Sequence, residues 1–166
     1  VAVRDLESYA PHISAAFGKY AIPVFLDRKD AISGKTPVIA VCAALDACLN
    51  GFRCDDVIRL SKTGLAGADF EEAARLENYA LTWNINGQAW EKDFSGHPDG
   101  FGAVPDEDSR ALLARLNGIR SRLISPLKKL RESAKCAGAT RLCEAVFEYL
   151  RDAGVPETLK KRAGEL

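Results

Sequence analysis

The sequence has no methionine, only two histidines, and no pair of cysteines spaced as Cys-x-x-Cys. Its cysteines are odd in number, and most lie among apolar residues, where a reduced thiol behaves as a small hydrophobic group. Without the usual ligand spacing, a zinc or iron–sulfur site in this chain is not expected. The cysteine pattern fits a reducing, cytoplasmic setting.

Long hydrophobic runs are also missing, and none approaches the length of a membrane span. We therefore expect no membrane partner. The chain opens with Val-Ala-Val-Arg rather than with methionine, and we expect it to be a piece of a longer protein.

A complete phosphate-binding loop is absent, although the Gly-Lys-Thr triplet at 34–36 resembles the end of one. Such a loop needs a glycine five positions before that triplet, so that successive backbone N–H groups can surround a phosphate. Lys29 stands at that position. Pro37 follows as a typical first residue of a helix. The sequence predicts a polar turn before a helix, and no nucleotide-binding site.

The first 33 residues predict a small βαβ element. Val1–Val3 and Ile22–Leu26 are apolar runs of strand length. Apolar residues at spacings of three and four predict a helix over Asp5–Phe17. Strand, helix and strand in so short a segment imply two parallel strands at the edge of a larger sheet.

From Pro37 onward the pattern predicts only helices and loops. Pro37–Leu49 is almost wholly apolar, which indicates a buried central helix. Asp69 and Asp106 precede acidic first turns, as is typical of helix starts. Pro126 should kink or restart the helix that follows Asp106. Further helices are predicted at 55–62, 69 to about 83, 142–150 and 156–161, and an exposed loop at 84–105.

The paired carboxylates and the two histidines are the candidate catalytic groups, and neither set requires a catalytic role. The paired carboxylates at 55–56, 71–72 and 106–108 all stand at predicted helix starts, where the helix dipole favours them. His12 and His97 have no serine or cysteine motif directed at them. We expect no catalytic residue in this chain.

Trp83, Trp90, Phe94 and Phe101 gather around the predicted loop. Large aromatic side chains usually bury area, so the favoured interpretation is that they seal the loop onto the helices beneath it. The alternative is a platform for stacking nucleobases.

Charge is balanced overall but segregated along the chain. Residues 1–109 hold 10 basic and 17 acidic side chains, whereas residues 110–166 hold 13 basic and 6 acidic ones. This asymmetry indicates either a nucleic-acid contact or an acid–base match within the molecule, and the sequence leaves both open. The basic residues that create the excess, our candidates for DNA contact, are Arg110, Arg115, Arg120, Arg122, Lys128, Lys129, Arg131 and Lys135.

Several segments together resemble the AddB subunits of AddAB-type ATP-dependent helicase–nucleases, which resect double-strand breaks in many bacteria. The match is clear over residues 1–90 and extends through the later helices. The segments that carry it are VAVRDLESY (1–9), FGKYAIPVFLDRKDAI (17–32), LSKTGL (60–65), LENYAL (76–81), the Ile-Asn-Gly at 85–87 with Trp90, the Asn-Gly-Ile-Arg at 117–120 and the Ser-Pro-Leu at 125–127.

The resemblance implies a mainly α fold with a small N-terminal βαβ element. Residues 1–33 would start the second RecA-like (2A-type) domain, and 34–166 would form a helical 2B-type insertion domain. It further implies a non-catalytic module, in the bacterial cytoplasm, that contacts duplex or forked DNA or an AddA-like partner subunit. The family's ATP, Mg²⁺ and 4Fe-4S cluster would be bound elsewhere in the parent, because none of those motif residues maps onto this chain. A stand-alone helical protein–protein adapter is the alternative.

Overall fold

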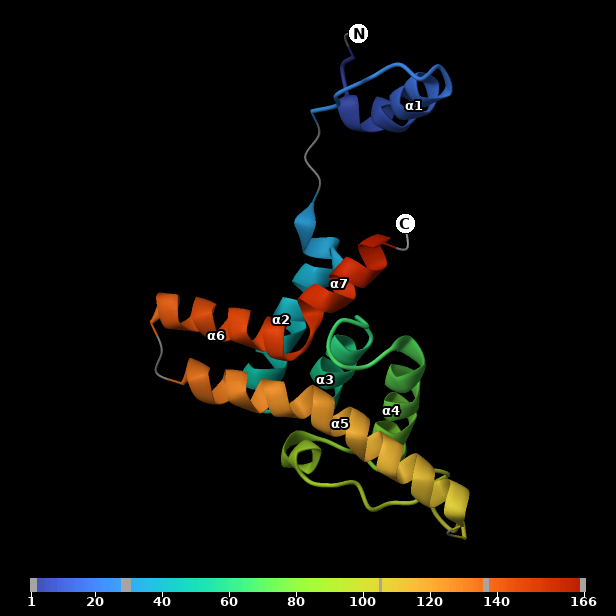
Figure 1. The fold of residues 1–166 in the computed structure, drawn as a ribbon, viewed down its shortest axis with the longest axis vertical. Coiled ribbons are helices and arrows are strands. Elements are labelled where there is room, and N and C mark those ends of the chain that lie inside the picture. The colour runs from blue at the N-terminus through green and yellow to red at the C-terminus, as the bar shows by residue number, and fades with distance from the viewer. Residues whose placement is uncertain (1–2, 28–30, 105, 136–137, 165–166) are drawn as a thin grey trace. The chain divides into compact units, whose positions relative to one another are not determined.

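The computed structural model describes residues 3–27, 31–104, 106–135 and 138–164. Over these residues the chain consists of helices and loops, without a β-strand. It divides into two units, one ending at Ile32 and the other beginning at Ser33 (Figure 1). The predicted mainly α class is therefore confirmed, and the predicted βαβ element is not seen.

In the described part of the first unit there is one α-helix, α1 (Leu6–Lys19). It begins after Asp5, whose carboxylate accepts a hydrogen bond from the Glu7 backbone N–H at 3.1 Å. The predicted strand at Ile22–Leu26 is wrong, as these residues form no ladder. A parallel strand is stable only where a sheet supplies backbone partners. Of the predicted strand at 1–3, residue 3 is not in a strand and the first two lie outside the described residues.

The short 3-10 turn η1 (Ile32–Gly34) spans the division, and the second unit continues with α2 (Thr36–Leu49), which confirms the predicted turn and helix. Alanines occupy the packed face of α2 at positions 40, 43, 44 and 47, all buried. Their small side chains let α3 (Cys54–Ser61) and the long helix α5 pack against this face. Leu49, on the opposite face, is 83% exposed, so only one side of the predicted central helix is buried.

A reciprocal cap begins α4 (Phe70–Thr82). The Asp69 carboxylate accepts from the Glu72 backbone N–H at 2.8 Å, and the Glu72 carboxylate accepts from the Asp69 backbone N–H at 3.3 Å. The predicted start of this helix is confirmed, since the capping signal is local in sequence.

The segment after α4 contains the 3-10 helix η2 (Gly87–Glu91) and is sealed onto the helices by aromatic side chains. Trp90 is fully buried, and the Phe94 ring stacks on Tyr79 with 4.6 Å between centroids. The Trp83 indole N–H donates to the His97 carbonyl at 3.0 Å. A side chain at Gly96 would collide with the Trp83 ring. The sealing interpretation is therefore confirmed for Trp90 and Phe94, whereas Phe101 lies against the Trp83 ring but remains 80% exposed.

The helix α5 (Glu107–Ala134) is the longest element and crosses the second unit (Figure 1). Its predicted start at Asp106 is confirmed by a second reciprocal cap, with Ser109. Pro126 does not restart the helix, which continues for two further turns. A buried apolar stripe runs along this helix at Leu116, Ile119, Leu123, Leu127 and Leu130.

Two helices complete the unit. Along α5 lies α6 (Ala139–Asp152), and after a turn at Gly154, with φ of 70°, α7 (Val155–Gly164) follows (Figure 1). Both are longer than predicted. None of the helices in the described ranges combines the length and apolar character needed to cross a bilayer.

We predict opposite outcomes for two leucines of α4. Leu76 is fully buried, so Leu76→Ala should lower the free energy of unfolding by about 2–5 kcal/mol. Leu81 is 68% exposed, and Leu81→Ala should change it by less than about 0.5 kcal/mol. Urea denaturation of both variants measures the difference, and equal losses would contradict the packing described.

Candidate nucleic-acid interface

The basic residues of α5 and its end are the candidates for a nucleic-acid interface, and their local surroundings decide what they can contact. Seven of the eight form ion pairs with carboxylates of the same chain. The eighth, Arg110, is exposed and has no ion pair within the described residues.

Arg120 is buried and holds the loop after α4 against the middle of α5. Its side chain is 10% exposed and forms an ion pair with Asp93. Its guanidinium donates to the Trp90 carbonyl at 3.1 Å and lies over the Phe94 ring, 5.7 Å from the centroid. A guanidinium placed in this way is committed to the fold, because its donors are already used inside the protein.

Asn117, one turn earlier on α5, fixes the same loop. Its side-chain oxygen accepts from the Phe94 backbone N–H at 2.7 Å, and its amide donates to the Phe94 carbonyl at 3.0 Å. No role is predicted for Asn117 from the sequence. The available signal was a polar amide within a stripe of leucines, since such a residue usually has a hydrogen-bonding reason to be there.

Glu91, at the end of η2, joins two of the candidate cations. Lys128 Nζ and Arg131 Nη2 each lie 3.0 Å from its carboxylate oxygens. The hydrogen bond from Lys128, followed by that from Arg131, lowers the pKa of the Glu91 carboxyl below its ordinary value. Arg131 also lies over the buried Phe52 ring, 4.4 Å from its centroid. This cluster attaches the second half of α5 to the loop.

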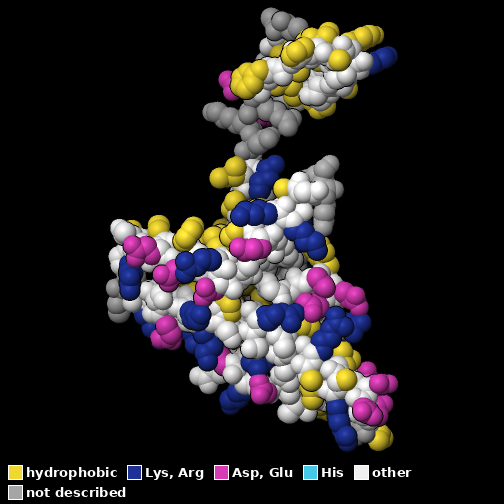
Figure 2. Space-filling view, viewed as in Figure 1, with side chains coloured by type: hydrophobic (Ala, Val, Ile, Leu, Met, Phe, Trp, Pro, Cys, Tyr) yellow, Lys and Arg dark blue, Asp and Glu magenta, His cyan; other side chains and the backbone are white. Residues whose placement is uncertain are grey.

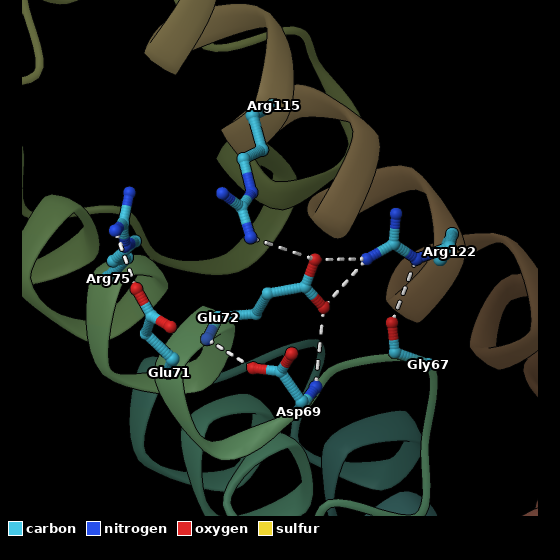
Figure 3. A network of polar contacts seen from close by, with 7 residues as sticks. All are labelled: Gly67, Asp69, Glu71, Glu72, Arg75, Arg115 and Arg122. Carbon is cyan, nitrogen blue, oxygen red and sulfur yellow. Dashed lines mark hydrogen bonds and ion pairs between the residues drawn. The ribbon is translucent and has the colours of Figure 1, made fainter.

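Glu72 forms the corresponding anchor between α4 and the first half of α5 (Figure 3). Arg122 Nη2 donates to both carboxylate oxygens, at 2.9 and 2.8 Å, while Arg122 Nε donates to the Gly67 carbonyl at 2.9 Å. Arg115 Nη2 lies 3.9 Å from the same carboxylate. The acid that caps α4 therefore also receives two arginines from α5.

The remaining pairs are at the surface. Lys129 Nζ lies 2.9 Å from Asp152 of α6, and Lys135 Nζ lies 3.0 Å from Glu132. Both lysine side chains are more than half exposed. Ion pairs of this kind contribute only about 0–1 kcal/mol, so a phosphate can compete for these lysines.

The structure therefore shows an acid–base match within the molecule, one of the two possibilities that the sequence left open. Basic residues of α5 and its end pair with carboxylates of the same chain. Figure 2 shows Lys and Arg side chains interspersed with Asp and Glu over the visible face of the second unit. Glu72, Glu91 and Asp93, which pair with arginines of α5, all belong to residues 1–109, where acidic side chains are in excess. Several of the cations still face water, which is the condition for a contact with a phosphate.

The described residues contain no group of three or more His, Cys, Asp or Glu side chains that could hold a metal. Cys48 is partly buried with its Sγ 3.4 Å from the Leu127 carbonyl oxygen, and burial raises the pKa of its thiol to about 11. A thiol in this setting is a packing group rather than a thiolate ligand.

Comparison with known proteins shows a similarity along nearly the whole chain. The chain is 31% identical over 170 aligned positions to the AddB subunit of the ATP-dependent helicase/deoxyribonuclease of Clostridium acetobutylicum, covering 99% of this chain and 15% of that protein. Against the protein of the same name from Acetivibrio thermocellus it is 32% identical over 167 positions, covering 96% and 14%. Against that of Caldanaerobacter subterraneus it is 29% identical, covering 97% and 14%.

The resemblance to AddB is thereby confirmed, and the chain spans about 15% of the length of these curated relatives. No family model matches the chain.

We predict that Arg120 stabilises the fold whereas Arg115 contributes little. Arg120→Gln would leave the Trp90 carbonyl without its donor and should lower the free energy of unfolding by about 2–3 kcal/mol. Arg115→Gln removes a half-exposed pair and should change it by less than about 0.5 kcal/mol. Thermal and urea unfolding of the two variants test this, and a stable Arg120 variant would refute the assignment.

We also predict a pH-dependent contribution from Glu91. Because its folded pKa is lowered, the stabilisation is present above the ordinary glutamate value of 4.5 and is lost as the pH falls through the lowered pKa. Glu91→Gln should therefore be less stable than the starting chain at neutral pH, and the difference should shrink in acid. Urea titrations at a series of pH values measure this, and a difference independent of pH would contradict it.

Proposed function

Proceeding from this similarity to one segment of AddB, we propose that the chain is a non-catalytic, mostly helical module of an AddB-like subunit. The parent protein would act in the resection of double-strand breaks and in recombinational DNA repair. The observation that carries the proposal is the alignment of 99% of this chain with 15% of a much longer helicase/deoxyribonuclease protein.

In this proposal the segment before residue 34 starts a 2A-type RecA-like domain, and residues 34–166 form the helical 2B-type insertion. The chain would work in the bacterial cytoplasm beside an AddA-like partner subunit. ATP, Mg²⁺ and the 4Fe-4S cluster would be held by other parts of the parent. The charged helix α5 would act as a rigid support that presents cations to duplex or forked DNA.

The structure divides the candidate cations by what they can do. Arg120 and Arg131 face carboxylates and aromatic rings inside the fold, so they support α5 rather than contact DNA. Arg110, Lys129 and Lys135 are exposed and are the best placed to neutralise phosphates. The surface pairs of the two lysines are weak enough to exchange for a phosphate.

A second candidate function is contact with the partner subunit, and exposed apolar side chains favour it. On α6, Phe147 is 67% exposed and Leu142 is 37% exposed, and Leu159 of α7 is 37% exposed. Aromatic and aliphatic side chains that remain in water are the usual anchors of protein interfaces. The same exposed apolar side chains would support the alternative of a stand-alone helical protein–protein adapter.

We predict that the exposed cations set the salt dependence of binding to duplex DNA. A triple variant, Arg110→Gln with Lys129→Gln and Lys135→Gln, should bind duplex and forked DNA more weakly. Its slope of log affinity against log salt should be shallower by up to about 0.9 for each phosphate that the variant no longer neutralises. Fluorescence anisotropy across a salt series, with blunt and forked DNA, measures the slope.

The matched control is Lys35→Gln with Arg53→Gln and Lys92→Gln, three exposed cations outside α5 that give the same change in charge. Its slope should stay close to that of the starting chain. Equal slopes for the two triple variants would exclude α5 as the DNA contact. An absence of DNA binding at low salt would transfer the role to the partner-subunit interface.

A further inference from the structure

A groove lies between the turn that precedes α4 and the helix α7. It has a volume of about 390 Å³, within the size range of ligand pockets. The glycine-containing turn at 64–69 and Phe70 form one wall, and Ala153, Gly154 and Thr158 belong to the other. Lys161 and Arg162 add two positive charges, so the groove combines an aromatic ring with cations.

Phe70 is unusual because its ring remains in water. It is the first residue of α4, and it is 66% exposed although it borders the groove. Arg162 lies over the ring, 5.7 Å from its centroid. One face of an exposed aromatic ring beside a guanidinium is a surface on which a nucleobase can stack.

The arginine is held in place by the backbone. Arg162 Nη2 donates to the Gly64 carbonyl at 2.9 Å, and a side chain at Gly64 would lie only 2.6 Å from that nitrogen. Within the described residues neither Lys161 nor Arg162 forms an ion pair with a carboxylate. Both cations border the groove, where each can receive a phosphate oxygen.

One carboxylate, that of Asp69, also lines the groove. It already accepts the Glu72 backbone N–H at 2.8 Å as the cap of α4. The cations of the groove therefore exceed its acids, which favours an anionic occupant.

The groove continues toward α5. A neighbouring hollow of about 320 Å³ shares Gly67, Ala153 and Gly154 with it and reaches Arg122 and Ser125. Because they share these lining residues, the two hollows lie side by side between α5 and Phe70, and Asp152 also borders the second one. An extended chain with regularly spaced negative charges and flat rings suits two adjoining hollows better than a compact ligand does.

We propose that this groove binds single-stranded DNA, with a nucleobase stacked on Phe70 and the adjacent phosphate held by Lys161 and Arg162. The inference rests on the proposed function, which it makes more specific: the exposed cations of α5 and its end contact the duplex, and the groove takes an unpaired strand. An unpaired strand is required because a base within a duplex has no free face for the ring.

Binding of fluorescein-labelled oligo(dT) of about 12 nucleotides to the chain tests the proposal by anisotropy. Phe70→Ala should weaken binding about tenfold, whereas Phe70→Trp, which keeps a stacking ring, should restore it. The matched control is Phe147→Ala, because Phe147 is 67% exposed but lies on α6 away from the groove residues. It should leave oligo(dT) binding unchanged.

A second measurement separates stacking from charge. An abasic oligonucleotide of the same length should bind more weakly than oligo(dT), and its binding should not respond to Phe70→Ala. Lys161→Gln with Arg162→Gln should weaken both. Equal binding of the two oligonucleotides would overturn the stacking assignment, and equally strong displacement of oligo(dT) by a poly-glutamate peptide would assign the groove to an acidic protein segment instead.

Blunt duplex DNA distinguishes this inference from the proposed function. If duplex binding depends on the exposed cations of α5 and its end while oligo(dT) binding is indifferent to Phe70, only the groove inference fails. If the chain binds no DNA of either kind at low salt, both fail together.

Discussion

The attachment of the loop after α4 to the middle of α5 is the constraint on which the rest of the second unit depends. Arg120 and Asn117 reach from α5 to the backbone carbonyls and N–H groups of Trp90 and Phe94. These interactions satisfy polar backbone groups that the aromatic side chains remove from water. With the loop fixed, Trp90 and Phe94 complete a core that also receives α2, α3 and the leucine stripe of α5.

The structure shows which basic residues of α5 support the fold, which the composition of the chain could not show. An excess of Lys and Arg in one part of a chain suggests a nucleic-acid contact, yet here most of it faces carboxylates of the same molecule. The pairs on Glu72 and Glu91 are partly shielded from solvent, which makes them less exchangeable than the lysine pairs at the surface. A charged helix can therefore serve as a structural support along one strip and as a contact surface along another.

Features that depend on residues close together in the sequence could be predicted, whereas features that depend on distant residues could not. The starts of α4 and α5 were predicted because the acids at 69 and 106 bond to backbone groups three residues away. The strand at Ile22–Leu26 was wrong because strand formation needs partners that lie outside the segment. The partners of Arg120 and Arg131 lie 27 and 40 residues away, so no local pattern could identify them. The groove beside Phe70 escaped prediction for the same reason, since α7 returns to it from the end of the chain.

The ion pairs along α5 fix its position along the neighbouring helices. A stripe of leucines repeats every three or four residues, so a helix that slid by one turn along its neighbours would bury nearly the same apolar surface. Such a slide would separate Arg122 from Glu72 and Arg120 from Asp93 at once, leaving a buried guanidinium without its partner. The ion pairs thus specify the register of α5. They favour its native position over positions shifted by one turn, which would bury a similar apolar surface.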